Sequence, residues 1–269
     1  MSSDADGGSE GAGMDLTGKT ALVTGSSKNI GRATAVRLAE AGADVGITAR
    51  SDEAGCEETA RRVREAGGEA AVALGDIGDP DDIEAVVEHV RDRLGPIDVL
   101  VNNATYRPSK PFLDIDAADV DRVMDVNFRG VLLTTQAVVP DMQERGGGAV
   151  VNLIGAMVYL GKTGHSHSYG SKLGLEGQIR QLATELGGDD IRVNGVSPGL
   201  IDVDRSRTEE WERIEREVIR ATPLERLGRV DEIADACCFL ASDASSFVTG
   251  QVLHVNGGTY PTPTLVPDE

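Results

Sequence analysis

Residues 19–41 form the segment that most constrains the fold of this chain. A short apolar run, Ala21–Val23, is bounded by glycines and is too short for a helix, which predicts a buried strand. A turn rich in Gly, Ser and Asn follows, and the apolar spacing after it predicts a helix that ends at Gly42. A strand, a glycine-rich turn and a helix within about 20 residues are typical of the phosphate-binding half of a dinucleotide-binding unit.

The physical chemistry of this turn suits a pyrophosphate. The start of a helix presents unpaired N–H groups and about half a positive charge. Gly25 and Gly31 allow backbone to come close to a ligand and to the helix, where a Cβ would collide. Asn29 stands where a middle glycine is often found, so an ordinary strand-to-helix turn remains an alternative for this segment taken alone.

Strands and helices alternate along the rest of the chain without a linker. The predicted strands cover residues 21–23, 44–49, 69–74, 97–101, 149–154, 191–197 and 251–255, and the predicted helices cover residues 33–41, 53–66, 80–94, 117–142, 168–186 and 230–240. The strands are apolar, as in a parallel sheet that is covered on both faces. We therefore expect a single Rossmann-type, doubly wound α/β domain over residues 14–269. Its sheet has seven mainly parallel strands, and its active crevice lies at their carboxyl ends. Residues 1–13 are polar and acidic and read as a disordered tail.

The composition narrows the possible partners and the compartment. The net charge is −19 over 269 residues, with only five lysines, which argues against nucleic acid and anionic membranes as partners. The acidic excess suits a high-salt cytoplasm, and a merely acidic mesophilic protein is the alternative. No apolar run is long enough to cross a membrane. Three cysteines, two of them adjacent, indicate no metal site and fit a reducing cytoplasm.

The end of the second predicted strand bears on cofactor choice. An acid at this position would bind the ribose 2′-hydroxyl of NAD. The chain has Ala49 and Arg50 there, and Lys28 lies in the glycine-rich turn. A guanidinium can hold a 2′-phosphate, so these residues favour NADP(H) over NAD(H). The alternative is that Arg50 is only a solvated strand end.

Several further motifs occur in order along the chain. They are TGSSKNIG at residues 24–31, Asp76-Ile77, Asn102-Asn103-Ala104, Asn127 in DVNFRG, Lys172 in SKLGLEG, Ile191–Asn194, Pro198-Gly199 and Asn256-Gly257-Gly258. With these motifs the sequence resembles the short-chain dehydrogenase/reductase family from about Asp15 to Tyr260, and within it the reductases of 3-oxoacyl carriers. The resemblance implies a nicotinamide cofactor and the interconversion of a carbonyl and a secondary alcohol on a small molecule.

The resemblance also implies a role for particular residues. Those expected around the pyrophosphate, the adenosine ribose and the adenine are Gly25, Ser27, Lys28, Asn29, Ile30, Gly31, Arg50, Asp76 and Ile77. Those expected near the nicotinamide and its ribose are Asn103, Ala104, Lys172, Pro198, Gly199 and Ile201. The helices over residues 117–142 and 168–186 would form the faces of a homodimer or homotetramer.

The chain departs from the family at the proton-transfer residues. The family uses Asn, Ser, Tyr and Lys, with the Tyr four residues before the Lys and the Ser 13 residues before the Tyr. Here Asn127 and Lys172 are present, but Ser168 and Gly155 stand at the Tyr and Ser positions. Tyr169 lies one position late, which turns it by about 100° on a helix.

Three interpretations of this departure stay open. The enzyme is active with another acid, for which Tyr169, His165, His167 and Tyr159 are candidates. Alternatively, it binds the cofactor without turnover as a structural or sensing protein, or the substrate or water supplies the proton. Instead of acting in proton transfer, the histidines could simply lie in a surface loop. Ser168 could simply be a helix N-cap. The acid-rich segment 200–222, which contains Trp211, would disfavour anionic substrates.

Overall fold

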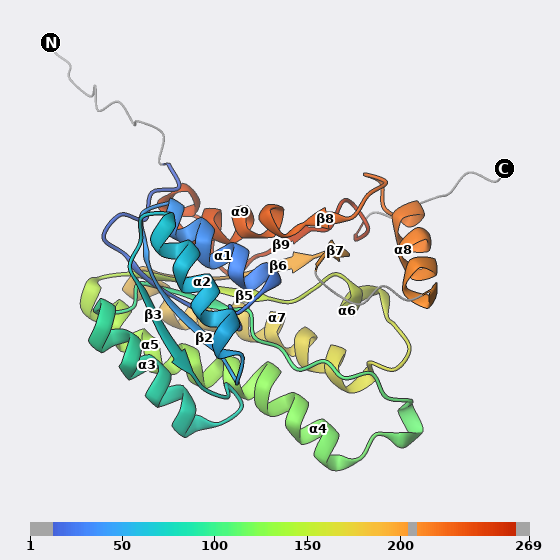
Figure 1. Cartoon of the computed structure of the whole chain (residues 1–269). Coiled ribbons are helices and arrows are strands. Elements are labelled where there is room, and N and C mark those ends of the chain that lie inside the picture. The colour runs from blue at the N-terminus through green and yellow to red at the C-terminus, as the bar shows by residue number, and fades with distance from the viewer. Residues whose placement is uncertain (1–12, 204–208, 262–269) are drawn as a thin grey trace, which may run out of the picture.

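The seven long strands form one parallel sheet at the centre of the molecule (Figure 1). The computed structural model describes residues 13–203 and 209–261. The strand order is β3-β2-β1-β4-β5-β6-β9, and each neighbouring pair is parallel. The strands are β1 (Thr20–Thr24), β2 (Asp44–Ala49), β3 (Ala70–Leu74), β4 (Val99–Asn102), β5 (Gly148–Leu153), β6 (Ile191–Pro198) and β9 (Val252–Val255).

Helices cover both faces of this sheet. Helices α1 (Asn29–Glu40), α2 (Glu53–Glu65) and α9 (Val230–Ala241) pack on one face, and α3 (Pro80–Leu94), α5 (Gly130–Arg145) and α7 (Ser166–Leu186) pack on the other (Figure 1). Successive side chains of a strand point to opposite faces. In β1, Ala21 and Val23 accordingly join one buried apolar cluster and Leu22 joins the other. The predicted doubly wound domain with a seven-stranded sheet is therefore confirmed.

The long helix predicted over residues 117–142 is present, but it is not α-helical throughout. It consists of α4 (Ala117–Met124), a π-helical turn η2 (Asp125–Arg129) and α5, which continues to Arg145. A Cβ on Gly130 would lie 2.1 Å from the Ile77 carbonyl oxygen, so only glycine allows the chain after η2 to approach so closely. The wider turn matters because it carries Asn127.

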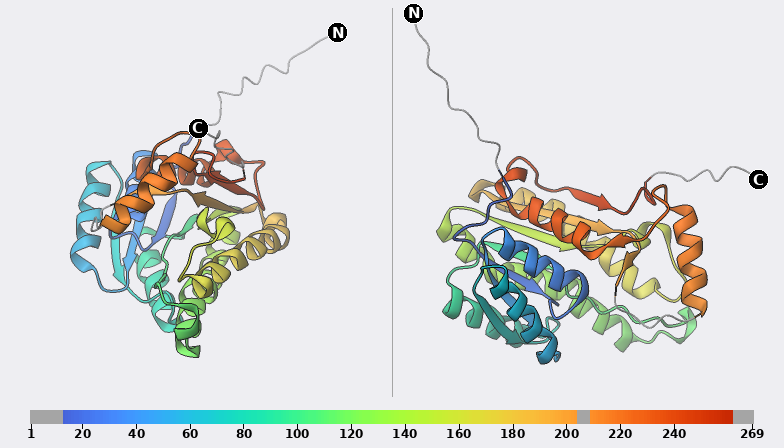
Figure 2. Two further views of the ribbon diagram at one scale, coloured as in Figure 1. Left: turned by 90° about the vertical axis from the view of Figure 1, so that its right-hand side faces the viewer. Right: turned by 45° about the horizontal axis from the view of Figure 1, so that its top comes forward.

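Short elements at the carboxyl ends of the strands were not predicted. They are η1 (Phe112–Asp114), α6 (Met157–Leu160), β7 (Ile201–Asp202) and β8 (Gly228–Arg229), with η3 (Gly187–Asp189) and η4 (Asp243–Ser245) elsewhere. Strands β7 and β8 pair in parallel, and α8 (Glu209–Ala221) is the predicted helical part of segment 200–222. In the left view of Figure 2, α8 crosses the end of the molecule at which the strands terminate. The predicted tail and the Trp211 side chain lie outside the described residues.

Candidate active site

The glycine-rich turn is shaped by close backbone contacts. Gly25 has φ +64°, and a Cβ there would lie 2.8 Å from the Ala104 Cα. A Cβ on Gly31 would lie 2.3 Å from the Gly25 carbonyl oxygen. Helix α1 begins at Asn29, which itself has φ +51°. The turn therefore brings the N–H groups at the start of α1 to the edge of the sheet, in a cradle that larger residues would fill.

Residues Asn103 and Ala104 hold this turn in place. The Asn103 Nδ2 donates hydrogen bonds to the Thr24 and Gly25 carbonyl oxygens, both at 2.9 Å. The Ala104 N–H donates to the Thr24 Oγ1 at 3.0 Å. The structure thus brings together two groups of predicted cofactor-binding residues that lie far apart in the sequence. The contacts of these two residues stabilise the cradle.

Two exposed cations lie beside the cradle. Lys28 is the residue before α1, and Arg50 follows β2. Among the described residues, neither side chain forms a hydrogen bond or an ion pair. Ser27 is buried, and its hydroxyl is hydrogen-bonded to the Asp52 carboxylate. Both cations are thus available to a phosphate, as the predicted preference for NADP(H) requires.

Asp76 and Ile77 follow β3 on the same side of the sheet. Burial alone would raise the pKa of Asp76, but hydrogen bonds from the Gly78 N–H and from Arg122 outweigh it and lower the pKa. The Arg122 guanidinium lies 2.5 Å from the Asp76 carboxylate. Ile77 is buried, and Ile30 is partly buried. Asp76 is therefore an ionised, paired carboxylate next to the predicted adenine position.

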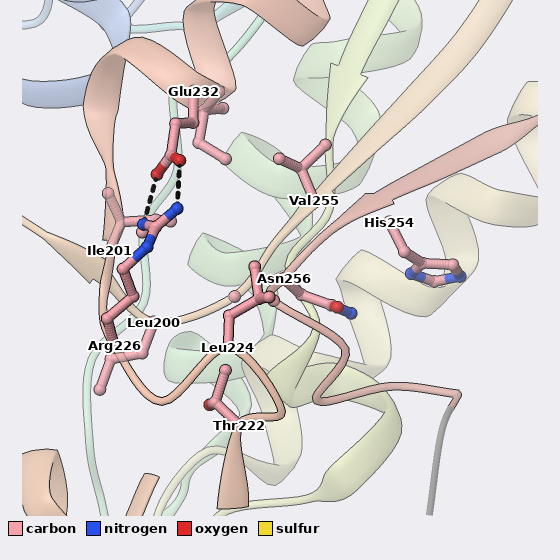
Figure 3. Close-up of a pocket in the computed structure, with 13 residues that line it drawn as sticks. Leu200, Ile201, Thr222, Leu224, Arg226, Glu232, His254, Val255 and Asn256 are labelled. Carbon is pink, nitrogen blue, oxygen red and sulfur yellow. Dashed lines mark hydrogen bonds and ion pairs between the residues drawn. The ribbon is translucent and has the colours of Figure 1, made fainter. Parts of the chain in front are cut away.

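A cavity of about 260 Å³ opens beyond the carboxyl ends of β6 and β9 (Figure 3). Gly199 and Ile201 line it, next to Pro198 at the end of β6, so it adjoins the predicted nicotinamide position. On one side Arg226 and Glu232 form an ion pair at 2.6 Å, so these two charges neutralise each other. The lining contains none of the predicted catalytic side chains, which lie on the π-helical turn η2 and on α7.

Lys172 is the most buried ionisable group of the predicted catalytic set. Only 5% of the residue is exposed, and its Nζ donates a 2.7 Å hydrogen bond to the Leu153 carbonyl oxygen. Burial, with a smaller contribution from the nearby positive charge of Arg107, lowers the pKa of Lys172 to about 7. The amine is therefore divided between its charged and neutral forms near neutral pH.

Asn127 is fixed by four hydrogen bonds. Its Nδ2 donates to the Tyr106 carbonyl oxygen at 2.8 Å and to the Ser171 Oγ at 3.2 Å. Its Oδ1 accepts from the Tyr106 N–H at 2.8 Å and from the Thr105 Oγ1 at 3.1 Å. The side chain thereby ties the loop after β4 to helix α7. This explains the need for an amide, which both donates and accepts.

Ser168 and Gly155, which stand at the family's Tyr and Ser positions, carry no phenol. Ser168 lies one turn before Lys172 on α7 and is 1% exposed, and its hydroxyl donates to the His165 carbonyl oxygen at 3.2 Å. The alternative that Ser168 is the helix N-cap is wrong, because α7 begins at Ser166 and its N-cap residue is His165. Gly155 has φ +114°, and a Cβ there would meet no atom within 4 Å. Neither residue supplies an acid of suitable pKa.

His165 and Tyr169 form a stacked pair at the start of α7. Their rings are 5.1 Å apart at 8°. Tyr169 is buried in the apolar cluster between α7 and the sheet, and burial raises the pKa of its phenol. Only 8% of His165 is exposed, and its Nδ1 has no hydrogen-bond partner among the described residues. Burial lowers the pKa of His165, and the positive charges of Lys162 and Arg107 lower it further. A hydrogen bond with the Pro108 backbone raises the pKa, but by less.

The two other candidate acids are less suitably placed. The Tyr159 hydroxyl donates to the Glu176 carboxylate at 3.0 Å, and its ring stacks on Tyr260 at 4.4 Å. Burial and the Glu176 charge raise the pKa of Tyr159 far above neutrality. The His167 ring nitrogens are buried without a hydrogen-bond partner among the described residues. Of the two histidines His165 is the more buried, and it is the N-cap residue of α7, three residues before Ser168.

One residue of this site was missed by sequence reasoning. Arg107, in the loop after β4, acts electrostatically on His165, Tyr169 and Lys172. No motif or spacing in the loop singles it out, because its position depends on how two loops meet. In the part of the chain described, no three His, Cys, Asp or Glu side chains gather as a metal site, and no helix is long and apolar enough to span a membrane.

The parallel sheet, the glycine cradle at the start of α1 and the polar cluster at the strand ends define a Rossmann-type dinucleotide-binding protein. A family model described as "Enoyl-(Acyl carrier protein) reductase" matches residues 25–260. The chain belongs to the short-chain dehydrogenase/reductase family.

Individual relatives cover nearly the whole chain. The 3-oxoacyl-(acyl-carrier-protein) reductase FabG of Staphylococcus aureus is 33% identical over 247 residues, which is 92% of this chain and 100% of that protein. A solved short-chain alcohol dehydrogenase of Sinorhizobium meliloti is 36% identical with a TM-score of 0.88, over 93% of this chain and 99% of the other. A gluconate 5-dehydrogenase of Burkholderia cenocepacia, solved with NADP and tartrate, is 33% identical with a TM-score of 0.82, over 91% and 96%.

Proposed function

We propose that this protein is an NADP(H)-dependent oxidoreductase that interconverts a secondary alcohol and a carbonyl, with His165 as its proton carrier. The observation that carries the proposal is the arrangement of α7. His165 is the N-cap residue of α7, Ser168 lies in the first turn of the helix, and Lys172 lies one turn further on. The His165 imidazole is buried, and its Nδ1 has no hydrogen-bond partner among the described residues.

Two observations support NADP(H) as the cofactor, namely the shape and charge of the glycine cradle and a related structure that contains NADP. The cradle at Gly25 and Gly31 is open only because no Cβ fills it, and Lys28 and Arg50 are exposed beside it. The gluconate 5-dehydrogenase relative was solved with NADP. When bound, the nicotinamide exchanges a hydride with the substrate carbon. In this assignment Lys28 and Arg50 bind the 2′-phosphate, and Lys172 holds the hydroxyls of the nicotinamide ribose.

His165 is suited to act as a general base on the alcohol. The stacked Tyr169 ring and the Pro108 backbone fix the imidazole. Because its pKa is lowered, the imidazole is neutral at pH 7 and can take the proton from the substrate hydroxyl. This favours alcohol oxidation near neutrality, whereas carbonyl reduction requires the imidazolium.

The deciding experiment separates His165 from Tyr169. Turnover with NADP⁺ and NADPH would be measured on a panel of secondary alcohols and ketones for wild type, His165→Ala and Tyr169→Phe. General acid–base catalysis contributes about 10²–10⁴-fold, so His165→Ala should lose at least about 100-fold in kcat. Added imidazole should restore part of this loss. The matched variant Tyr169→Phe keeps the stacked ring and should retain most of the activity.

Other outcomes would name another group. Loss of activity in Tyr169→Phe but not in His165→Ala would make the phenol the acid and refute the role of His165. Equal activity in all three proteins would point to a proton supplied by substrate or water. NADPH binding should stay unchanged in both variants, which shows that the cofactor site is intact.

Binding of the cofactor without turnover is the second candidate function. It is supported by Ser168, whose hydroxyl is engaged with its own helix, and by Gly155, which has no side chain. Tight NADPH binding with no turnover on the whole panel would favour it. The two functions therefore predict opposite results in one assay.

The oligomeric state belongs to the same proposal. Apolar side chains remain exposed on the helices expected to form subunit contacts, namely Val120, Met124, Leu132 and Leu173. Burial of such side chains against a second copy would stabilise a dimer or tetramer. Light scattering would determine the mass. The three cysteines are buried thiols, in keeping with the proposed cytoplasmic location.

A further inference from the structure

The end of β3 lies beside the end of β2. Ala49 pairs with Leu74 across the two strands, and the Gly75 N–H donates to the Ala49 carbonyl oxygen at 3.1 Å. Arg50 and Asp76 are the next residues of the two segments, so they leave the sheet side by side. Because Arg50 is proposed to bind the 2′-phosphate, Asp76 belongs to the part of the site that holds the adenosine half of the cofactor. We call this part the adenosine end.

Asn127 belongs to the other end of the site. Its Nδ2 donates to the Ser171 Oγ at 3.2 Å, and the residue after Ser171 is Lys172, which is proposed to hold the nicotinamide ribose. We call this part the nicotinamide end. Two hydrogen bonds of 2.8 Å join the Asn127 amide to the backbone N–H and carbonyl oxygen of Tyr106. The position of the loop that contains Tyr106 and the position of the Asn127 side chain therefore depend on each other.

The Arg122 side chain, on α4, connects the two ends. Its Nη2 donates to the Asp76 Oδ2 at 2.5 Å, and its guanidinium carbon lies 5.7 Å from the centre of the Tyr106 ring. A cation at this distance from an aromatic ring is attracted to it. A Cβ on Gly78 would lie 2.5 Å from the Arg122 Nη1, so glycine leaves the space that the guanidinium occupies. One side chain thus contacts the carboxylate of the adenosine end and the ring of the residue whose backbone binds Asn127.

We propose that Arg122 is a positioning residue that couples the adenosine end of the cofactor site to its nicotinamide end. The ion pair with Asp76 fixes the guanidinium, and the contact with the Tyr106 ring then fixes the loop that holds Asn127. The nicotinamide half of the cofactor therefore meets a site that is already ordered, which reduces the entropy lost on binding. The inference rests on the NADP(H) assignment of the proposed function but not on the residue that carries the proton.

Arg129 offers a matched control for Arg122. It forms an ion pair with Asp125 at 2.8 Å, and both residues lie within η2. This ion pair stays within one helical turn, whereas the ion pair of Arg122 joins α4 to the segment after β3. Substituting either arginine by methionine removes the same charge from an existing ion pair.

Binding of the whole cofactor can be compared with binding of its adenosine half. Calorimetric titrations would use NADPH and adenosine 2′,5′-bisphosphate, which has the 2′-phosphate but lacks the nicotinamide and its ribose. The ratio of the two affinities measures what the nicotinamide half contributes. The proteins would be wild type, Arg122→Met, Tyr106→Leu, the double variant with both substitutions, and Arg129→Met.

We expect Arg122→Met to lower the ratio of NADPH affinity to bisphosphate affinity about 5-fold. Tyr106→Leu removes the ring but keeps the backbone, and it should lower the ratio to a similar extent. The double variant should lower it no further, because both substitutions remove the same contact. Arg129→Met should change the ratio by less than about 2-fold.

Several results would overturn the inference. An equal loss of affinity for both ligands in Arg122→Met would make Arg122 a residue of the adenosine end alone. Additive effects of the Arg122 and Tyr106 substitutions, an unchanged ratio, or a loss shared by Arg129→Met would also contradict the coupling. Failure of wild type to bind NADPH would refute the inference together with the proposed function. The expected ratios in a protein that turns over no alcohol or ketone would refute the proposed function only.

Discussion

Replacing Lys172 by methionine should make the protein more stable and inactive. The amine is 5% exposed and has one hydrogen bond, to a neutral carbonyl oxygen, and no carboxylate partner among the described residues. Burying a charge without a counterion is costly, and this cost is what lowers the pKa. Methionine has a similar length and no charge, so it removes the cost without opening a cavity.

The size and sign of the effect follow from linkage. The pKa is 10.5 in the unfolded reference and about 7 in the folded protein. Between these values the unfolded state binds more protons, so the free energy of unfolding rises with pH by about 1.4 kcal/mol per unit. Below pH 7 the folded protein therefore bears the full cost, about 5 kcal/mol for 3.5 units. The cost falls by about 2 kcal/mol between about pH 7 and about pH 9.

One opposing effect does not depend on pH. In Lys172→Met the Leu153 carbonyl oxygen loses its donor, which costs about 1–3 kcal/mol. The net gain in stability near pH 7 is therefore about 2–4 kcal/mol. Screening by salt does not remove it, because the cost is desolvation of a buried group rather than repulsion between exposed charges.

Urea unfolding at several values between about pH 6.5 and about pH 9 would measure the effect as a difference between the two proteins. The excess stability of Lys172→Met should be largest at the low end and shrink as the pH rises. Lys28→Met removes an exposed lysine and controls for the loss of one positive charge from an acidic protein. A Lys172→Met protein that is less stable than wild type at pH 6.5, or a difference that does not change with pH, would refute the reasoning.

Three other changes test other parts of the structure. Gly155→Ala and Gly177→Ala both add a Cβ that meets no atom within 4 Å, but only Gly155 has a positive φ, +114°. In urea unfolding, Gly155→Ala should lower the free energy of unfolding by about 1–2 kcal/mol and Gly177→Ala should raise it by about 0.5–1 kcal/mol. Equal effects of the two substitutions would contradict the backbone argument. Arg50→Ser should weaken NADPH binding about 10-fold or more without changing NADH binding, while the exposed Arg93→Ser on α3 should change neither, as fluorescence titration would show. The melting temperature should rise between about 0.1 M and about 2 M KCl because screening reduces the self-repulsion of a chain with charge −19, and a constant or falling value would exclude that effect.

The layered fold was predictable because its signals are local. Each strand is a short apolar run bounded by turn residues, and the predicted bounds of 44–49 and 80–94 agree with β2 and α3. The turn at Gly25 and Gly31 was predictable for the same reason, since glycine is required wherever backbone approaches backbone. Elements of two to four residues, such as α6 and the β7–β8 pair, have too few residues to show a period.

The surroundings of the predicted catalytic residues could not be predicted, because they depend on contacts between distant segments. The π-helical turn at Asn127 follows from the close approach of Gly130 to Ile77. His165 and Tyr169 are only four residues apart, but the stacking of their rings depends on side-chain orientations that the sequence does not show. The position of Arg107 follows from the contact between two loops. Each of these is set by packing, which a single sequence does not display.

The loss of the family's serine and tyrosine leaves the rest of the site intact for a structural reason. Asn127 is held by the Tyr106 backbone, Thr105 and Ser171, and Lys172 is held by the Leu153 carbonyl oxygen. None of these bonds uses a side chain at position 155 or 168. The scaffold that orients the amide and the amine is therefore independent of the proton donor. A different donor near the start of α7 therefore needs no rearrangement of that scaffold, which is compatible with the proposed role of the buried His165 imidazole.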